Sequence, residues 1–196
     1  QAPPQAIVNL HGYVSGTTTA NNVTQSIDIK DNYAIAYYQY SHDTVNWANN
    51  PNPWVISWEG SWTLYARAVD IAGNVGPISS PYSITINRIY QINHPTGGIS
   101  YAVTLQEAIN VATSSSTIYL LKDTVDGATN IINGKVLVYN SNARTLTLTN
   151  GNGGLTIDSN AGLFIQGNGT ITSSNTNTII TNLGELQVQG SNIIQQ

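Results

Sequence analysis

Four tryptophan residues fall within sixteen positions in the first half of the chain: Trp47, Trp54, Trp58 and Trp62. Flat aromatic rings stack on sugar faces and fill pockets at protein interfaces. Trp62 alternates with Leu64, so we expect it in a core, and we expect Trp47 to pack between two sheets. Trp54 and Trp58 flank a proline-rich loop, and we predict that they contact a host or matrix glycan or protein. The alternative is local packing of the loop.

Oxygen donors near predicted strand ends could hold a metal ion. They are Asp28, Asp31, Asp70 and Asn74. Calcium takes six to eight oxygen ligands, so these side chains are candidates for a calcium site that would stiffen a domain junction. The alternative is that Asp70 hydrogen-bonds its own turn. Calcium is the only cofactor that the sequence suggests.

Other reactive groups are few. Cysteine is absent, which removes disulfides, thiolate metal sites and thiol nucleophiles. The three histidines, His11, His42 and His94, lack the paired spacing of zinc ligands, and we expect them at the surface. In the second half, Asp158 and Glu185 are far enough apart to lie on neighbouring coils of a solenoid, but isolated acids on a solvated face are the commoner case. We therefore predict no catalytic residues.

Composition narrows the class of protein and of partner. Charged residues make up 8% of the 196 residues, against about 25% in an average soluble protein, and the net charge is −4 without runs of either sign. This charge pattern argues against nucleic-acid binding. Membrane insertion is not predicted either, because the sequence lacks a stretch of about 18 apolar residues. The polar residues are mostly Asn, Thr, Ser, Gln and Gly, which favour turns and β-surfaces. We predict an all-β protein.

Short alternating segments occupy the first half, from Ile7 to about Ile86, with turn residues between them. Strands at this spacing predict a β-sandwich. The segment Ala68-Val69-Asp70-Ile71-Ala72-Gly73-Asn74, with the strand and turn pattern around it, resembles the immunoglobulin-like (Ig-like) repeat of bacterial surface proteins over about residues 5–88. The resemblance implies an extracellular domain used for spacing and adhesion.

The second half begins with a helix signal. Thr104-Leu105-Gln106-Glu107 has the spacing of a capping box. Apolar triplets follow, and from Leu146 onward they recur about every eight residues. Three such strands give a repeat of about 24 residues, which predicts a three-sided parallel β-helix, a solenoid.

This order of helix, strand and triplets resembles the pectin-lyase-like right-handed β-helix over about residues 93–196. The resemblance implies that the short N-terminal helix caps the open end of the β-helix core. The resemblance implies a fold that hosts polysaccharide lyases and hydrolases. The fold alone does not imply either activity, because function has to be argued from a site. The predicted domains are an Ig-like sandwich at 1–88, a linker at 89–98 and the N-terminal part of a β-helix at 99–196.

These observations predict a non-catalytic structural or adhesive module of a bacterial cell-surface or secreted protein. The alternatives are a non-catalytic portion of a secreted polysaccharide lyase or glycoside hydrolase, and a carbohydrate-binding module. We expect the chain to be a piece of a longer protein, because it opens on a linker-like Gln1–Gln5 and stops within a strand pattern. An uncapped last coil would also favour self-association through the open end of the β-helix.

Overall fold

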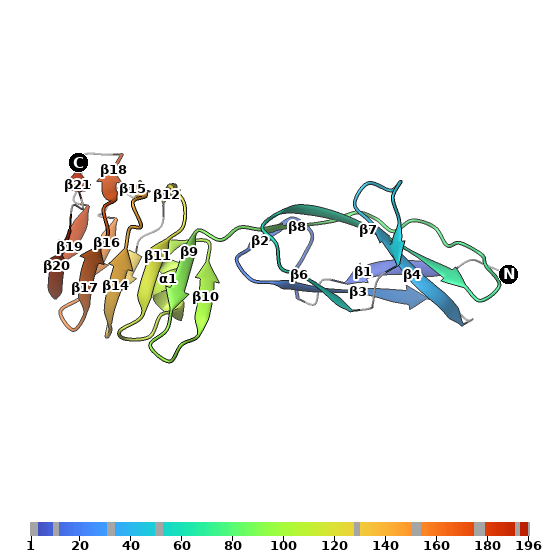
Figure 1. The fold of residues 1–196 in the computed structure, drawn as a ribbon, viewed down its shortest axis with the longest axis horizontal. Helices are drawn as coiled ribbons and strands as arrows, with labels where there is room; N and C mark the ends of the chain where they lie inside the picture. The colour runs from blue at the N-terminus through green and yellow to red at the C-terminus, as the bar shows by residue number, and fades with distance from the viewer. Residues whose placement is uncertain are drawn as a thin grey trace. The chain divides into compact units, whose positions relative to one another are not determined.

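The computed structural model describes residues 4–9, 12–30, 34–49, 53–127, 130–149, 154–174, 179–190 and 193–195. In this part of the chain the protein is all-β, as predicted, with one short helix. The chain divides into two compact units, residues 1–87 and residues 88–196 (Figure 1).

The first unit contains two sheets. One has three antiparallel strands in the order β1-β3-β6: β1 (Gln5–Asn9), β3 (Val23–Lys30) and β6 (Trp54–Ile56). The other has five strands in the order β2-β8-β7-β4-β5: β2 (Thr17–Thr19), β8 (Tyr82–Ile86), β7 (Gly60–Asp70), β4 (Ile35–Ser41) and β5 (Ala48–Asn49). Only the short β2 pairs with its neighbour in parallel within the described part of this sheet.

One apolar cluster lies between the two sheets. Alternate residues of β7 point into it, and Leu64, Ala66 and Ala68 are fully buried. The three-stranded sheet contributes Val8 and Ile56 among others. This alternation is what a strand with one buried face requires, and it fixes the register because a slip of one residue would expose the apolar set.

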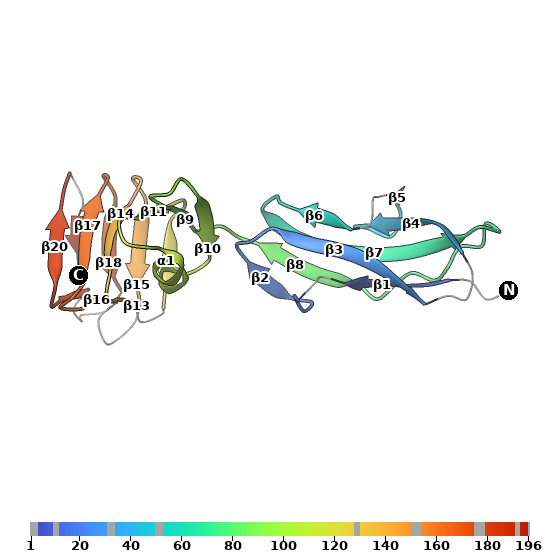
Figure 2. The same cartoon turned by 90° about the horizontal axis from the view of Figure 1, so that it is seen from below.

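The second unit is a stack of coils whose strands form three sheets (Figures 1 and 2). The first sheet has the order β10-β9-β11-β14-β17-β20: β10 (Ile99–Ala102), β9 (Tyr90–Asn93), β11 (Thr117–Leu120), β14 (Val136–Asn140), β17 (Gly162–Gln166) and β20 (Glu185–Val188). The second has the order β12-β15-β18-β21: β12 (Thr124–Asp126), β15 (Thr145–Leu148), β18 (Thr170–Ser173) and β21 (Ile193–Gln195). The third has the order β13-β16-β19: β13 (Asn130–Ile132), β16 (Leu155–Ile157) and β19 (Ile180–Asn182).

Successive coils pair in parallel and nearly in step. In the third sheet Asn130 pairs with Leu155, and Leu155 pairs with Ile180. In the second sheet Thr145 pairs with Thr170, which pairs with Ile193. These register intervals lie close to the predicted 24-residue repeat. Each coil therefore adds one strand to each sheet, and apolar residues of neighbouring coils stack in one continuous core.

The helix α1 (Leu105–Val111) covers the core at the end of the stack that carries β9, β10 and β11 (Figure 2). The predicted capping box is present: the Glu107 N–H donates to Thr104 Oγ1 at 3.2 Å, and the Thr104 N–H donates to Glu107 Oε2 at 3.2 Å. The N–H of Leu105 donates to Oδ2 of the buried Asp126 at 2.8 Å. At the C-terminal end of the helix, Lys135 Nζ donates to the backbone oxygens of Ile109 and Ala112, which neutralises part of the helix dipole.

The prediction of a linker at residues 89–98 is wrong for residues 90–93. These form β9, which pairs antiparallel with both β10 and β11. Tyr90 and Ile92 are fully buried in the core of the second unit, so this segment belongs to that unit. The division between the units falls between Asn87 and Arg88.

Candidate functional site

An aromatic groove opens on the surface of the first unit, and residues of both its sheets line it. Its volume is about 290 Å³. It is lined by Tyr40, His42, Trp54, Val55, Ile56, Trp58 and Trp62. These residues come from β4 and the residue just after it, from β6, from the start of β7, and from the loop between β6 and β7. We call this feature the aromatic groove.

Strand alternation positions the walls of the groove. Tyr40 pairs with the buried Ala66, so it lies on the core-facing side of the five-stranded sheet. Trp62 lies on the same side, two residues before the buried Leu64. Both aromatic side chains pack against the edge of the core and remain partly exposed. The wall and the core are therefore continuous, which favours a preformed groove.

The rings of the groove lie against one another. The ring centroids of Tyr40 and Trp54 are 5.2 Å apart, and those of Tyr40 and His42 are 5.6 Å apart in an edge arrangement. The His42 and Trp62 centroids are 5.4 Å apart. Such spacings are typical of favourable aromatic pairs. The Trp62 indole also donates a hydrogen bond to the backbone oxygen of Trp58 at 3.2 Å, which ties the loop to the wall.

His42 has a defined hydrogen bond. Its Nδ1 lies 2.8 Å from the backbone oxygen of Thr63. A carbonyl oxygen only accepts, so Nδ1 carries the proton, and in the neutral ring Nε2 is the acceptor. His42 is exposed, and no described residue is bonded to Nε2.

The turn after β4 holds His42 in place. Ser41 Oγ and the backbone N–H groups of Val45 and Asn46 all donate to Asp43 Oδ1, and the Asn46 side chain donates to Oδ2. The hydrogen bonds from Asn46, followed by those from Val45 and Ser41, hold the pKa of the Asp43 carboxyl well below its usual range. The carboxylate is thus engaged within its own turn.

The two predicted contact residues, Trp54 and Trp58, both line the groove. Trp58 is 70% exposed, whereas Trp54 is half-buried and also packs against the core. Sequence reasoning missed Tyr40 and His42 and assigned Trp62 to the core alone. The signal for Tyr40 and His42 was weak, because they reach β6 only through the pairing of β4 with β7 and the packing of the two sheets against each other.

The prediction that Trp47 packs between the sheets is wrong. Its ring lies beneath the Arg67 guanidinium, 4.1 Å from ring centroid to Cζ, and its Nε1 donates to the Thr44 oxygen at 3.1 Å. Arg67 alternates with the buried Ala66 and Ala68, so it projects from the outer face of β7. The cation–π contact and the hydrogen bond hold Trp47 outside the core.

The structure brings together two of the four predicted calcium ligands. The Asn74 side chain donates to Asp70 Oδ2 at 2.8 Å, and two turn N–H groups donate to Oδ1. The Asn74 side chain is the main cause that lowers the pKa of Asp70, although burial acts in the opposite direction. Asp28 lies on the other sheet and accepts from the Asn9 side chain at 2.9 Å. Asp31 lies outside the described residues. Calcium binding stays a prediction.

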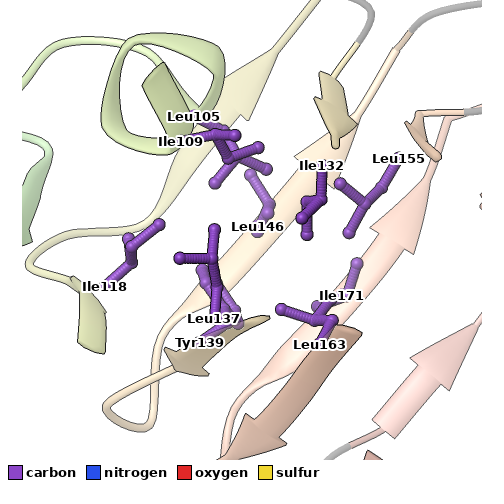
Figure 3. A pocket seen from close by; sticks show the side chains of 10 residues that line it. All are labelled: Leu105, Ile109, Ile118, Ile132, Leu137, Tyr139, Leu146, Leu155, Leu163 and Ile171. Carbon is purple, nitrogen blue, oxygen red and sulfur yellow. The ribbon is translucent and has the colours of Figure 1, made fainter. Parts of the chain in front are cut away.

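A second cavity lies within the core of the second unit, beneath α1 (Figure 3). Leu105 and Ile109 point into it from the helix, and strand residues such as Leu137 and Leu146 close it. Its volume of about 10 Å³ is close to the minimum that one water molecule needs, and all the lining side chains except Tyr139 are aliphatic. This cavity is a packing void and not a ligand site.

Two buried phenols lie in the same core. The hydroxyl groups of Tyr90 and Tyr139 have no hydrogen-bond partner among the described residues. Burial raises the pKa of both, and the nearby charge of Asp126 raises both further. Both phenols therefore stay protonated.

Sites of other kinds are not evident in the described residues. The described residues include no cluster of three or more His, Asp or Glu side chains that could hold a metal ion. The one described helix is too short to cross a membrane. At the end of the stack, the described residues show β19, β20 and β21 each paired on one side. Self-association through these strands stays a prediction.

Comparisons with known proteins give little guidance. No protein-family model matches the chain, and neither does any curated protein sequence. Among solved structures, the chain is similar to a family 28 exopolygalacturonase from Yersinia enterocolitica, with 11% sequence identity and a TM-score of 0.31. The likeness covers 88% of this chain and 41% of that one. A TM-score of this size does not establish a shared fold.

Proposed function

We propose that the chain is a non-catalytic adhesive module of a bacterial cell-surface or secreted protein, and that its aromatic groove binds a glycan. In this proposal the first unit is an Ig-like sandwich that presents the groove. The second unit is the opening of a right-handed, pectin-lyase-like β-helix that serves as a stiff spacer.

The aromatic groove is the observation that carries the proposal. Three indoles and a phenol line an open groove, and Trp58 is 70% exposed. Aromatic side chains gathered at one exposed site are typical of a binding surface, and pyranose rings offer apolar C–H faces to such rings. The volume of about 290 Å³ lies just below the usual range for small-molecule sites, about 300–1,000 Å³. It suits one or two sugar rings.

A protein ligand is the second candidate for the same groove. Exposed Val55 borders Trp58, and tryptophan is enriched among the residues that dominate protein interfaces. A glycan is preferred because His42 and the indole edges add fixed polar groups between stacking faces. Small-molecule sites combine these two features.

The test is a screen of the purified chain against a glycan array and a panel of matrix proteins, with and without calcium. The variant is Trp58→Ala, and the control is Ile71→Ala, which removes an equally exposed apolar side chain outside the groove. We expect glycan binding that Trp58→Ala abolishes and Ile71→Ala preserves. Binding that survives both Trp58→Ala and Trp54→Ala would contradict the proposed site.

A further inference from the structure

We propose that the aromatic groove selects an uncharged pyranose and that His42 orients it by accepting a hydrogen bond from a sugar hydroxyl at Nε2. This inference rests on the proposed function and specifies its ligand class.

The orientation of the His42 ring is fixed from three sides. Tyr40 meets it edge-on at 5.6 Å, Trp62 lies 5.4 Å away, and the Thr63 oxygen accepts from Nδ1 at 2.8 Å. The last contact also fixes the tautomer, because a carbonyl oxygen cannot donate. In the neutral ring, Nε2 is therefore an acceptor in a fixed direction beside the stacking faces. A hydroxyl donor is the partner that this geometry suits.

The charge of the groove selects against ionised sugars. No Asp, Glu, Lys or Arg side chain lines it. Two acids are next to lining residues in the sequence: Asp43 follows His42 and directs its carboxylate at Ser41, Val45 and Asn46, and Glu59 follows Trp58 but does not line the groove. A uronate or an aminosugar would lose hydration in the groove without gaining a counter-charge from any lining side chain, which is unfavourable. An uncharged sugar avoids that cost.

Besides the Tyr40 hydroxyl and the indole N–H groups, the lining has one further polar side chain, His42, and a hydrogen bond to the backbone fixes its ring. The Trp62 N–H is already used by the Trp58 oxygen. Stacking alone tolerates several ring orientations, whereas one directed acceptor distinguishes epimers whose hydroxyl points elsewhere. We therefore assign His42 as a specificity-determining residue.

The experiment is an NMR titration of the chain with methyl glucoside, methyl galactoside and methyl mannoside, and with glucuronic acid and glucosamine. Three variants are compared with the wild-type protein: His42→Phe, which keeps an aromatic ring but lacks the acceptor, His42→Gln, which restores an acceptor, and Trp58→Ala. Monodeoxy analogues of the tightest binder probe the same hydrogen bond from the ligand side, and they need no folded variant.

We expect an uncharged pyranoside to bind more tightly than either charged sugar. His42→Phe is expected to weaken binding about two- to tenfold, the effect of one hydrogen bond, and His42→Gln to restore most of the loss. One monodeoxy sugar should weaken wild-type binding by a similar factor and have no further effect on His42→Phe. Non-additivity of this kind is the sign of a direct contact.

Two results separate the inference from the proposed function. Binding that depends on Trp58 but not on His42, or tighter binding of a charged sugar, overturns the inference and leaves the groove as a glycan site. An absence of binding by every sugar, or binding unaffected by Trp58→Ala, overturns both.

Discussion

The indole Nε1–H of Trp62 donates a hydrogen bond to the backbone oxygen of Trp58 at 3.2 Å. This contact joins the start of β7 to the preceding loop, which carries Trp58, the most exposed indole of the groove. The loop is therefore held in place before a ligand arrives. A preformed site loses less conformational entropy on binding than a mobile one.

Replacement of Trp62 by Phe tests this coupling. The phenyl ring keeps an aromatic wall but cannot donate to Trp58, so we expect ligand affinity to fall about two- to tenfold while the protein stays folded. Trp47→Phe is the matched control, because it removes an indole hydrogen bond to Thr44 outside the groove. Titration of a bound glycan measures both. Equal affinities for the two variants would mean that the bond does not order the site.

The cap of the coil stack depends on Lys135, whose ammonium group donates to the oxygens of Ile109 at 3.0 Å and Ala112 at 2.8 Å. Lys135→Met keeps much of the apolar part of the side chain but removes the ammonium group from the two backbone oxygens at the C-terminal end of α1. We expect the free energy of unfolding of the second unit to fall by about 1–3 kcal/mol. Urea unfolding followed by far-ultraviolet circular dichroism measures it, with Lys135→Arg as the control. An unchanged midpoint for Lys135→Met would show that water replaces the lysine.

The Tyr139 hydroxyl is buried without a partner among the described residues. Removing an unsatisfied buried polar group relieves a desolvation cost of about 1–3 kcal/mol. We therefore expect Tyr139→Phe to leave the second unit equally stable or more stable in the same urea experiment. Tyr139→Leu is the comparison that removes ring packing as well. A loss of stability in Tyr139→Phe would reveal a partner, such as a buried water molecule.

The first unit should lose stability in acid through Asp70. Because hydrogen bonds from Asn74 lower the pKa of Asp70 in the folded protein below its ordinary value of 3.8, the carboxylate stabilises the fold above that pH. The contribution is lost as the pH falls through the folded-state pKa. All four tryptophans lie in this unit, so tryptophan fluorescence follows its unfolding.

We expect Asp70→Asn to unfold at a lower urea concentration than the wild-type protein at neutral pH. The difference should shrink in acid, below the ordinary pKa of the carboxyl group. A difference that stays constant down to about pH 2 would assign the effect to the altered turn and not to the charge of Asp70.

Local rules in the sequence were enough to predict much of the fold. Thr104 and Glu107 form their capping box because both partners lie within one turn of chain. The apolar triplets predicted the stacked coils because each strand alternates between buried and exposed residues. β9 was missed because its four residues precede the breaker-rich segment 94–98, and the strand acquires its partners from β10 and β11.

The candidate site was only half predictable. Trp54 and Trp58 stood out because they lie four residues apart, next to a proline-rich segment. Tyr40 and His42 join them through pairing between strands far apart in sequence. Trp47 was assigned to the wrong side because its contact with Arg67 depends on the position of β7 beside β4. Such long-range contacts have no local signal.

The most direct test of the central claim is a ¹H–¹⁵N spectrum of the four indole N–H groups during titration with the glycan found in the screen. A ligand in the aromatic groove should shift the signals of Trp54, Trp58 and Trp62 and leave that of Trp47 in place. Binding that shifts none of the three groove signals, or that shifts Trp47 alone, would contradict a glycan site in the groove.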